Sequence, residues 1–190
     1  MDETISLNDI EVVKKSLENP DYFRAIIERY NKPLARYIKR RSHATEHDVD
    51  DILQEVFIKI YRNLNDFDER LAFSSWVYRI AHNHIIDWYR KEKKYNTIDL
   101  DDEGSVLVLT LAGDENADKY SNQHELKVEI NSVLETLDAN YKDVVILRFF
   151  EDKTYEEISD IMQIPVSLVG ARLNRAKTMI KKKLLEKTKK

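Results

Sequence analysis

Aromatic rings and cations alternate along residues 73–94, FSSWVYRIAHNHIIDWYRKEKK. Exposed rings can stack on unpaired bases and guanidinium groups can neutralise phosphates, so this mixture suits a protein that holds a single nucleic-acid strand without enzymatic chemistry. The alternative is an ordinary amphipathic helix with an aromatic core contact and a solvated basic end. The rest of the chain has to decide between these two interpretations.

At about 100° per residue, these residues predict one helix with three faces. The predicted core face carries Phe73, Val77, Ile80, Ala81, His84 and Trp88. A second sector carries Tyr78, His82 and Tyr89, and a third carries Arg79, Asn83 and Arg90. We expect the second and third sectors to be left for a partner.

The tripeptide His82-Asn83-His84 spells the name of a nuclease motif. In those nucleases the residues belong to a metal site built from two strands and a helix, whereas consecutive residues of one helix point in different directions. We therefore expect no catalytic residues and no enzymatic activity. Metal-dependent cleavage of plasmid DNA would contradict this expectation.

The composition predicts an all-α protein. The chain of 190 residues has three glycines, three prolines and 35% charged residues, which is a helical composition. Glycines this sparse exclude the phosphate-binding loops of nucleotide enzymes, and the absence of cysteine excludes disulfides, thiol catalysis and cysteine zinc sites. We expect no cofactor and no bound metal.

The first residues, MDETISLNDIEVVKK, are acidic and polar, and no apolar run approaches twenty residues. The sequence thus predicts no signal peptide, no membrane insertion and a cytoplasmic location.

Charge is distributed unevenly along the chain. Residues 1–95 hold 17 basic and 17 acidic side chains, residues 96–125 hold 1 and 8, and residues 126–190 hold 13 and 10. Residues 96–123 also lack helical periodicity. We therefore predict two small helical domains, 1–95 and 124–190, joined by an acidic flexible linker, 96–123, whose apolar stretch 106–111 we expect to dock on another surface.

In the first domain, apolar spacing predicts helices over 5–18 and 21–41, with Pro33 bending or interrupting the second. Thr45 can cap a third helix, in which an apolar stripe consists of Ile52, Val56, Phe57, Ile60 and Leu64. Off that stripe lie Asp50, Asp51, Gln54, Glu55 and Lys59. They are available to a partner; a divalent metal is the alternative, but no further ligand is placed to complete its site.

In the second domain, the sequence predicts helices over 124–137, 141–151, 154–162 and 167–186. Thr154 and Glu157 form a capping box, Gln163-Ile164-Pro165 forces a break, and Ser167 can cap the last helix. The residues spaced to pack the last two helices across each other are Ile158, Ile161, Ile164, Val169 and Leu173. This is the pattern of a helix-turn-helix.

Residues 166–190 carry nine basic side chains against Glu186 alone. Such a charge can hold phosphates, and the first turns of a recognition helix can reach base edges in the major groove. A solvated basic helix is the alternative, but the coincidence with the helix-turn-helix pattern favours DNA contact.

Both halves together resemble the extracytoplasmic-function (ECF) group of bacterial sigma factors in the sigma-70 family. DDILQEVFIKIYRNL at 50–64 is similar to region 2.2, FSSWVYRIAHNHIIDWYRKEKK to regions 2.3 and 2.4, and LRFFEDKTYEEISDIMQIPVSLVGARLNRAKTMIKKKL at 147–184 to region 4. The resemblance implies a factor that binds core RNA polymerase, directs it to promoter DNA and helps to open the duplex.

By position, the resemblance assigns polymerase binding to Asp51, Gln54 and Glu55. It assigns capture of the melted minus-10 strand to the loop 66–73 and the helix after it, with the candidates Phe67, Phe73, Arg79, Asn83 and Arg90. It assigns the minus-35 duplex to the recognition helix, with the candidates Ser167, Ala171, Arg172, Asn174 and Arg175. Family members are often held inactive by an anti-sigma factor, although no residue here identifies one.

A second interpretation is a helix-turn-helix regulator that does not replace the sigma subunit. It explains residues 141–186 and leaves the polar face of residues 50–59 and the aromatic helix without a role. The family pattern also has glycine where Gln163 stands, so a left-handed backbone there would cost roughly 1 kcal/mol.

Overall fold

The computed structural model of the protein describes residues 7–42, 44–92, 134 and 136–187, and these residues form helices joined by turns, with no strand among them. The chain divides into two compact units. The predicted all-α class is confirmed. The linker 96–123 and its apolar stretch 106–111 lie outside the described residues, as does most of the predicted helix 124–137.

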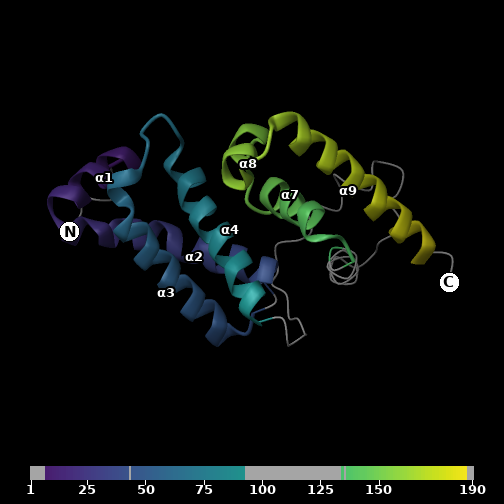
Figure 1. Cartoon of the computed structure of the whole chain (residues 1–190), viewed down its shortest axis with the longest axis horizontal. Coiled ribbons are helices and arrows are strands. Elements are labelled where there is room, and N and C mark those ends of the chain that lie inside the picture. The colour runs from purple at the N-terminus through teal and green to yellow at the C-terminus, as the bar shows by residue number, and fades with distance from the viewer. Residues whose placement is uncertain (1–6, 43, 93–133, 135, 188–190) are drawn as a thin grey trace. The chain divides into compact units, whose positions relative to one another are not determined.

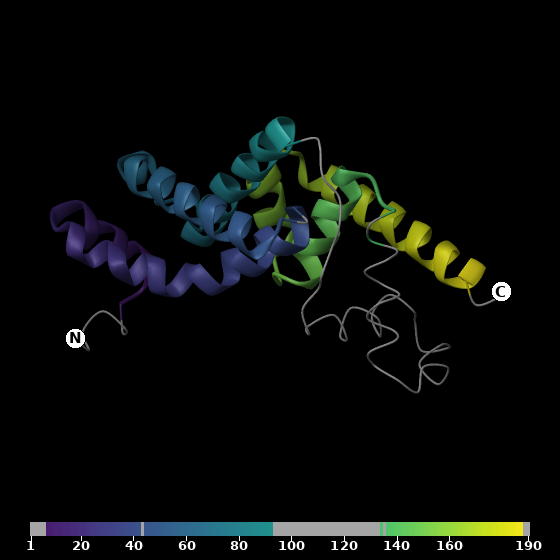
Figure 2. The same cartoon turned by 90° about the horizontal axis from the view of Figure 1, so that it is seen from below.

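The first unit contains four α-helices and two short 3₁₀ turns (Figure 1). Their bounds are α1 Asp9–Glu18, η1 Pro20–Tyr22, α2 Phe23–Ser42, α3 Glu46–Arg62, η2 Leu64–Asp66 and α4 Phe73–Glu92. Helices α2, α3 and α4 all contact one another, and Figure 2 shows α3 and α4 on the same side of α2. Their shared core includes Leu34, Tyr37, Ile38, Val56, Ile60 and Val77, which are fully or almost fully buried.

Pro33 was predicted either to bend or to interrupt this helix. Helix α2 continues through Pro33, so the helix is not interrupted there. Proline in a helix interior removes one backbone hydrogen bond and costs about 3 kcal/mol. The residues directly after it, Leu34, Tyr37 and Ile38, have no exposed surface. Burial of these large side chains stabilises the helix enough to offset that cost.

Local rules place the start of α3 correctly. The Thr45 side chain accepts a hydrogen bond from the Asp48 backbone N–H, and the Asp48 carboxylate accepts one from the Thr45 backbone N–H. This reciprocal pair satisfies two of the helix's otherwise unpaired donors. The predicted apolar stripe of α3 is buried throughout.

The second unit contains α7 Ala139–Phe149, most of α8 Tyr155–Met162 and α9 Val166–Lys187. The predicted capping box of Thr154 and Glu157 is present at the start of α8. Four of the five predicted packing positions, Ile158, Ile161, Val169 and Leu173, are completely buried, whereas Ile164 in the turn is half-buried. Helix α9 begins at Val166, and the Pro165 carbonyl accepts from the Leu168 and Val169 N–H groups. Ser167 is therefore inside the first turn and not the cap.

Gln163 ends α8 in the left-handed conformation, with φ 54° and ψ 47°. Its backbone N–H donates to the Ser159 carbonyl, and the Ser159 hydroxyl donates to the Ile164 carbonyl over 2.5 Å. These bonds hold the turn between α8 and α9 even though glutamine pays a steric cost there that glycine would not.

We expect Gln163→Gly to stabilise the second unit by roughly 1 kcal/mol, because glycine adopts this conformation without the clash between Cβ and carbonyl. Chemical denaturation of the whole chain, followed for the transition of the second unit, measures the change. Asn174→Gly, at an exposed position inside α9, is the control and should destabilise it. Equal destabilisation by both substitutions would contradict a strained Gln163.

Candidate nucleic-acid interface

The outer face of α3 presents the three residues predicted to bind a partner. Asp51 is exposed, as are Gln54 and Glu55 one helical turn later, while the neighbouring Ile52, Leu53 and Val56 are buried. The next turn of the same face adds Ile58 and Tyr61, which are 48% and 47% exposed. An acidic and amide-bearing face that continues into apolar surface is suited to a protein partner.

A buried histidine joins α3 to α4 behind this face. His84 Nδ1 lies 2.7 Å from Lys59 Nζ, and His84 Nε2 lies 3.3 Å from a Glu55 carboxylate oxygen. An ammonium group can only donate, so Nδ1 must accept, and the ring proton sits on Nε2 and points to Glu55. One neutral imidazole thus connects an exposed residue of α3 to the core of α4.

Burial, followed by the nearby Lys59 ammonium, lowers the pKa of His84 below its ordinary value of 6.5, although Glu55 and Asp87 oppose the shift. The unfolded chain therefore binds this proton more readily than the folded one. It follows that the free energy of unfolding should fall as pH drops below about 6.5 and be fully recovered above it. Thermal melts between pH 7.5 and 5.5 measure this, and His84→Gln should flatten the dependence. An unchanged slope in that variant would assign the proton to another group.

Phe67 and Phe73, predicted to contact the strand, are instead in the core. They are 9% and 3% exposed, and their ring centroids lie 5.0 Å apart in an edge-to-face contact. Trp76 packs on both, at 5.6 and 5.7 Å, and Tyr30 of α2 packs on Phe73 at 5.7 Å. Rings enclosed in this way offer no stacking face to a base. They support the loop 66–73 from the core.

The second predicted sector of α4 is also occupied by the protein itself. Tyr78 and His82 are 4% and 5% exposed; the Tyr37 hydroxyl lies 3.0 Å from His82 Nδ1, and the Tyr37 and Tyr78 ring centroids are 5.3 Å apart. Tyr89 donates its hydroxyl hydrogen to the Arg41 carbonyl over 3.0 Å. The expectation that this sector is left for a partner is therefore wrong, because α2 covers it.

The third sector keeps its predicted exposure. Asn83 and Arg90 are exposed and Arg79 is half-buried, and Arg90 lies 3.6 Å from Asp87 in a surface ion pair. Because His82 faces α2 and His84 faces α3, Asn83 between them points away from both. The three residues of the tripeptide thus diverge as predicted, and the amide of Asn83 is the member available to a partner.

The loop before α4 is held by local charge pairs. The Asp68 carboxylate accepts from the Arg70 backbone N–H over 3.0 Å and from the Arg70 guanidinium over 2.6 to 3.0 Å. The guanidinium and then the backbone N–H lower the pKa of Asp68 to about 2. On the neighbouring residue, Glu69 pairs with Lys14 of α1 at 2.9 Å. These contacts therefore fix the backbone that carries the loop's exposed side chains.

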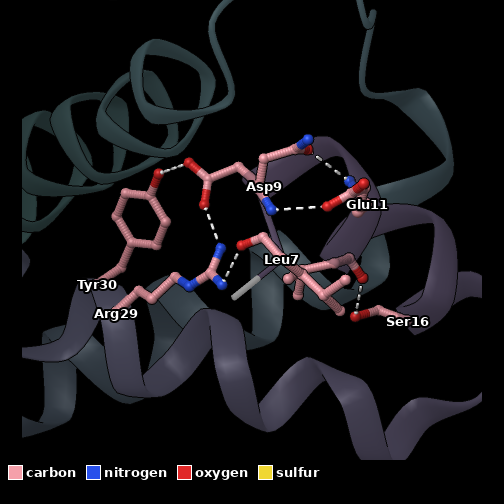
Figure 3. Close-up of polar contacts among 8 residues, drawn as sticks. Leu7, Asp9, Glu11, Ser16, Arg29 and Tyr30 are labelled. Carbon is pink, nitrogen blue, oxygen red and sulfur yellow. Dashed lines mark hydrogen bonds and ion pairs between the residues drawn. The ribbon is translucent and has the colours of Figure 1, made fainter. Parts of the chain in front are cut away.

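Helix α1 is tied to α2 by a polar cluster that sequence patterns did not single out. Figure 3 shows the Asp9 carboxylate between Arg29 and Tyr30, which donate to it over 2.8 and 2.5 Å. Arg29 also donates to the Leu7 carbonyl over 2.5 Å. Residues twenty positions apart make these bonds, so only the folded packing of α1 on α2 reveals them. The cluster fixes the helix that supports the loop through Lys14.

In the second unit, α9 presents four of its five predicted residues to solvent. Ser167, Ala171, Asn174 and Arg175 are exposed, and Arg172 is half-buried at the edge of this face. The opposite face of α9 is buried and consists of Val169, Leu173, Ala176 and Ile180. Gly170 lies between these faces, and a Cβ there would meet the Tyr155 ring at 3.6 Å, an ordinary contact. Glycine inside a helix costs about 1 kcal/mol relative to alanine. No close approach of another residue of this unit to Gly170 explains that cost.

In the part of the chain that the structure describes, no helix is long and apolar enough to cross a membrane. The same residues contain no group of three or more histidine or acidic side chains placed to hold a metal ion.

Two family models match this chain. The model described as Sigma-70 region 2 matches residues 26–95, and the model described as Sigma-70, region 4 matches residues 127–180. The first match contains α3, α4 and most of α2, and the second contains α7, α8 and most of α9. Each candidate face therefore lies within a matched region.

Curated relatives match over nearly the whole chain. The ECF RNA polymerase sigma factor SigW of Bacillus subtilis is 32% identical over 180 residues, which cover 92% of this chain and 94% of the relative. The ECF RNA polymerase sigma-E factor of Escherichia coli (strain K12) is 30% identical over 166 residues, covering 85% and 86%.

Solved structures share the fold. CnrH in complex with the cytosolic domain of CnrY matches with a TM-score of 0.66 at 24% identity, covering 94% of this chain and 97% of that one. The sigma factor RpoE in complex with the anti-sigma factor NepR from Bartonella quintana matches with a TM-score of 0.62 at 15% identity, covering 85% and 96%. Taken with the sequence matches to both sigma regions, these findings show that the chain belongs to the ECF group of RNA polymerase sigma factors in the sigma-70 family.

Proposed function

We propose that this sigma factor works through three separate surfaces. The outer face of α3 binds core RNA polymerase, the exposed side of α4 and the loop 66–73 bind one strand of the opened minus-10 element, and α9 binds the minus-35 duplex. The observation that supports this most is the simultaneous exposure of Asp51, Gln54 and Glu55 on α3 and of Ser167, Ala171, Asn174 and Arg175 on α9.

The surface proposed to bind the opened strand, which consists of the exposed side of α4 and the loop 66–73, does not present the stacking rings that the sequence led us to expect. Phe67, Phe73 and Tyr78 are buried, so the contacts available to a strand are polar: the amide of Asn83, the guanidinium groups of Arg79 and Arg90, and the exposed residues of the loop. Amides can bond base edges, and guanidinium groups can bond phosphates. In this proposal the buried rings stabilise the surface from behind.

Binding the opened strand supplies the energy for opening. Unstacking bases costs about a few kcal/mol per step, and a protein without nucleotide hydrolysis can offset that only by binding the open state better than the closed one. Contacts made only to unpaired bases meet this requirement. The two surfaces on duplex and strand therefore have different tasks.

Transcription with purified components tests the proposed function. Core polymerase and this protein alone should initiate at a defined start on a promoter selected from random sequence by the reconstituted holoenzyme. If initiation needs an additional housekeeping sigma subunit, the chain acts as a helix-turn-helix regulator instead. That alternative leaves the match to region 2 at residues 26–95 without a role.

Arg175→Ala should reduce affinity for the minus-35 duplex about tenfold while activity persists on a template that is already melted at minus 10. Arg175 is exposed on the outer side of α9, where it can contact a phosphate or a base edge, and such a contact is worth about 1 to 3 kcal/mol. Gel-shift titration and transcription from paired and pre-melted templates measure the two effects. Equal loss on both templates would count against separate surfaces.

An anti-sigma factor is a further partner that this proposal admits. One of the solved structures that share this fold, the sigma factor RpoE from Bartonella quintana, is in complex with the anti-sigma factor NepR. Binding of a candidate anti-sigma protein should compete with core polymerase for the exposed α3 face, and a pull-down with both present measures that competition.

A further inference from the structure

The first turns of α9 have an unusual surface for a helix expected to meet DNA. The six residues from Val166 to Ala171 carry no charge, and the first cation of the helix is Arg172. Within this uncharged stretch Leu168 is 39% exposed and Ala171 is exposed. A single exposed leucine is common on proteins, so its place relative to the other residues of α9 is what carries the argument.

Helical geometry puts Leu168 beside the predicted DNA-contacting residues. Ala171 and Arg175 follow Leu168 at three and seven positions, so the three form one stripe along α9. Ser167 and Asn174 lie on the adjacent side of the same outward surface, and Val169 and Leu173 face the core. The result is a small apolar spot, Leu168 and Ala171, bordered by hydroxyl, amide and guanidinium groups.

The chemistry of the major groove offers one apolar group for such a spot. Guanine, adenine and cytosine present hydrogen-bond donors and acceptors but no methyl group at their groove edges, whereas thymine also presents its C5-methyl. Leucine and alanine side chains can neither donate nor accept a hydrogen bond. Phosphates line the borders of the groove, where the later cations, Arg172, Arg175 and Lys177, can reach them.

We propose that Leu168 and Ala171 recognise thymine C5-methyl groups in the major groove of the minus-35 duplex. This specificity rests on the proposed function, since it requires α9 to enter that groove. It makes this sigma factor's duplex preference depend on methyl contacts at one or two base pairs, with Arg172 and Arg175 supplying attraction to the backbone.

Replacing thymine by deoxyuridine removes the methyl group and keeps every hydrogen-bonding atom of the base pair. The holoenzyme formed with core polymerase is titrated with its selected duplex, and each thymine in the minus-35 region is replaced in turn. A buried methyl group is worth about 0.8 kcal/mol, so one or two replacements should weaken binding about fourfold each. The other replacements should have little effect.

Leu168→Ala gives the matching change in the protein. It should weaken binding to the thymine duplex about as much as deoxyuridine does and should remove most of the difference between the two bases at the thymine that Leu168 contacts. Val166→Ala is the control, because Val166 is equally exposed, at 40%, but lies two residues away and thus on the other side of the helix. This variant should keep the full fourfold difference.

Three outcomes would overturn the proposal: no thymine responds to deoxyuridine, the selected duplex has no thymine in the region, or Leu168→Ala keeps the full difference between the bases. Weaker polymerase association in Leu168→Ala with an unchanged base difference would assign the apolar spot to a protein contact instead. Initiation assayed in parallel separates this result from the proposed function. If the holoenzyme initiates but its binding does not depend on thymine methyl groups, only the methyl contact is rejected. If no holoenzyme forms, titration of the full chain alone with the same duplexes still tests the methyl contact.

Discussion

Replacing Gln54 and Glu55 together by alanine should weaken association with core polymerase by about thirtyfold or more. Both side chains are exposed on the outer face of α3 next to Asp51, and the few central residues of an interface that dominate its affinity cost about 2 kcal/mol or more when truncated. The fold should survive, because the buried apolar residues of α3 are unchanged and only the contact of Glu55 with His84 is lost. Titration of labelled protein with core polymerase measures the change.

The control for this variant is Glu18→Ala on α1, an exposed carboxylate that lies on none of the three candidate surfaces. It should leave polymerase affinity unchanged. Gln54→Ala alone is also informative, because Glu55 has a second contact with His84 and its removal disturbs α4. Unchanged affinity in the double variant would remove the interface from α3, and equal losses in the double variant and in Glu18→Ala would point to a general defect.

Arg79→Ala combined with Asn83→Ala should reduce formation of the open complex at least tenfold while holoenzyme assembly and duplex binding are retained. Asn83 is the exposed member of the tripeptide and Arg79 flanks it one turn away. Removing a base-edge contact and a phosphate contact together costs about 2 kcal/mol or more. Permanganate footprinting of unpaired thymines and affinity for a single-stranded minus-10 oligonucleotide measure the effect.

The matched comparison for this second experiment is Arg175→Ala, which changes a cation on the other unit. The α4 variant should lose affinity for the single strand and keep affinity for the minus-35 duplex, and Arg175→Ala should do the reverse. If the α4 variant binds the oligonucleotide normally, the strand surface lies elsewhere. Phe73→Ala is a poor test, because loss of a buried ring would destabilise the unit by about 3 to 5 kcal/mol.

Local sequence rules account for much of the fold. The helices that begin after Thr45 and Thr154 start where a hydroxyl and a carboxylate three residues later can exchange hydrogen bonds. The buried stripe of α3 follows from apolar spacing alone. For Gln163, local rules predicted only the break before Pro165, and its left-handed backbone agrees with the family pattern, which has glycine at this position. These features depend on residues only a few positions apart.

The candidate surfaces were harder to predict, because exposure depends on distant partners. Tyr78 and His82 have the polar tips of surface residues, yet Tyr37 of α2, more than forty positions earlier, covers both. Phe67 and Phe73 are buried by Trp76 and by Tyr30. Helical spacing separates the faces of α4 but does not show which of them another helix occupies. Asn83 keeps its exposure because neither α2 nor α3 packs on that side.

The contacts of His84 with Lys59 and Glu55 connect α4, which we propose to bind the opened strand, with α3, which we propose to bind polymerase. Glu55 favours protonation of His84, whereas burial and Lys59 oppose it. A docking partner that draws the Glu55 carboxylate to itself would remove one of the two carboxylates, Glu55 and Asp87, that favour protonation of His84, and would thus favour the uncharged imidazole more strongly. Occupancy of one helix would then be registered as a change of proton affinity at the other.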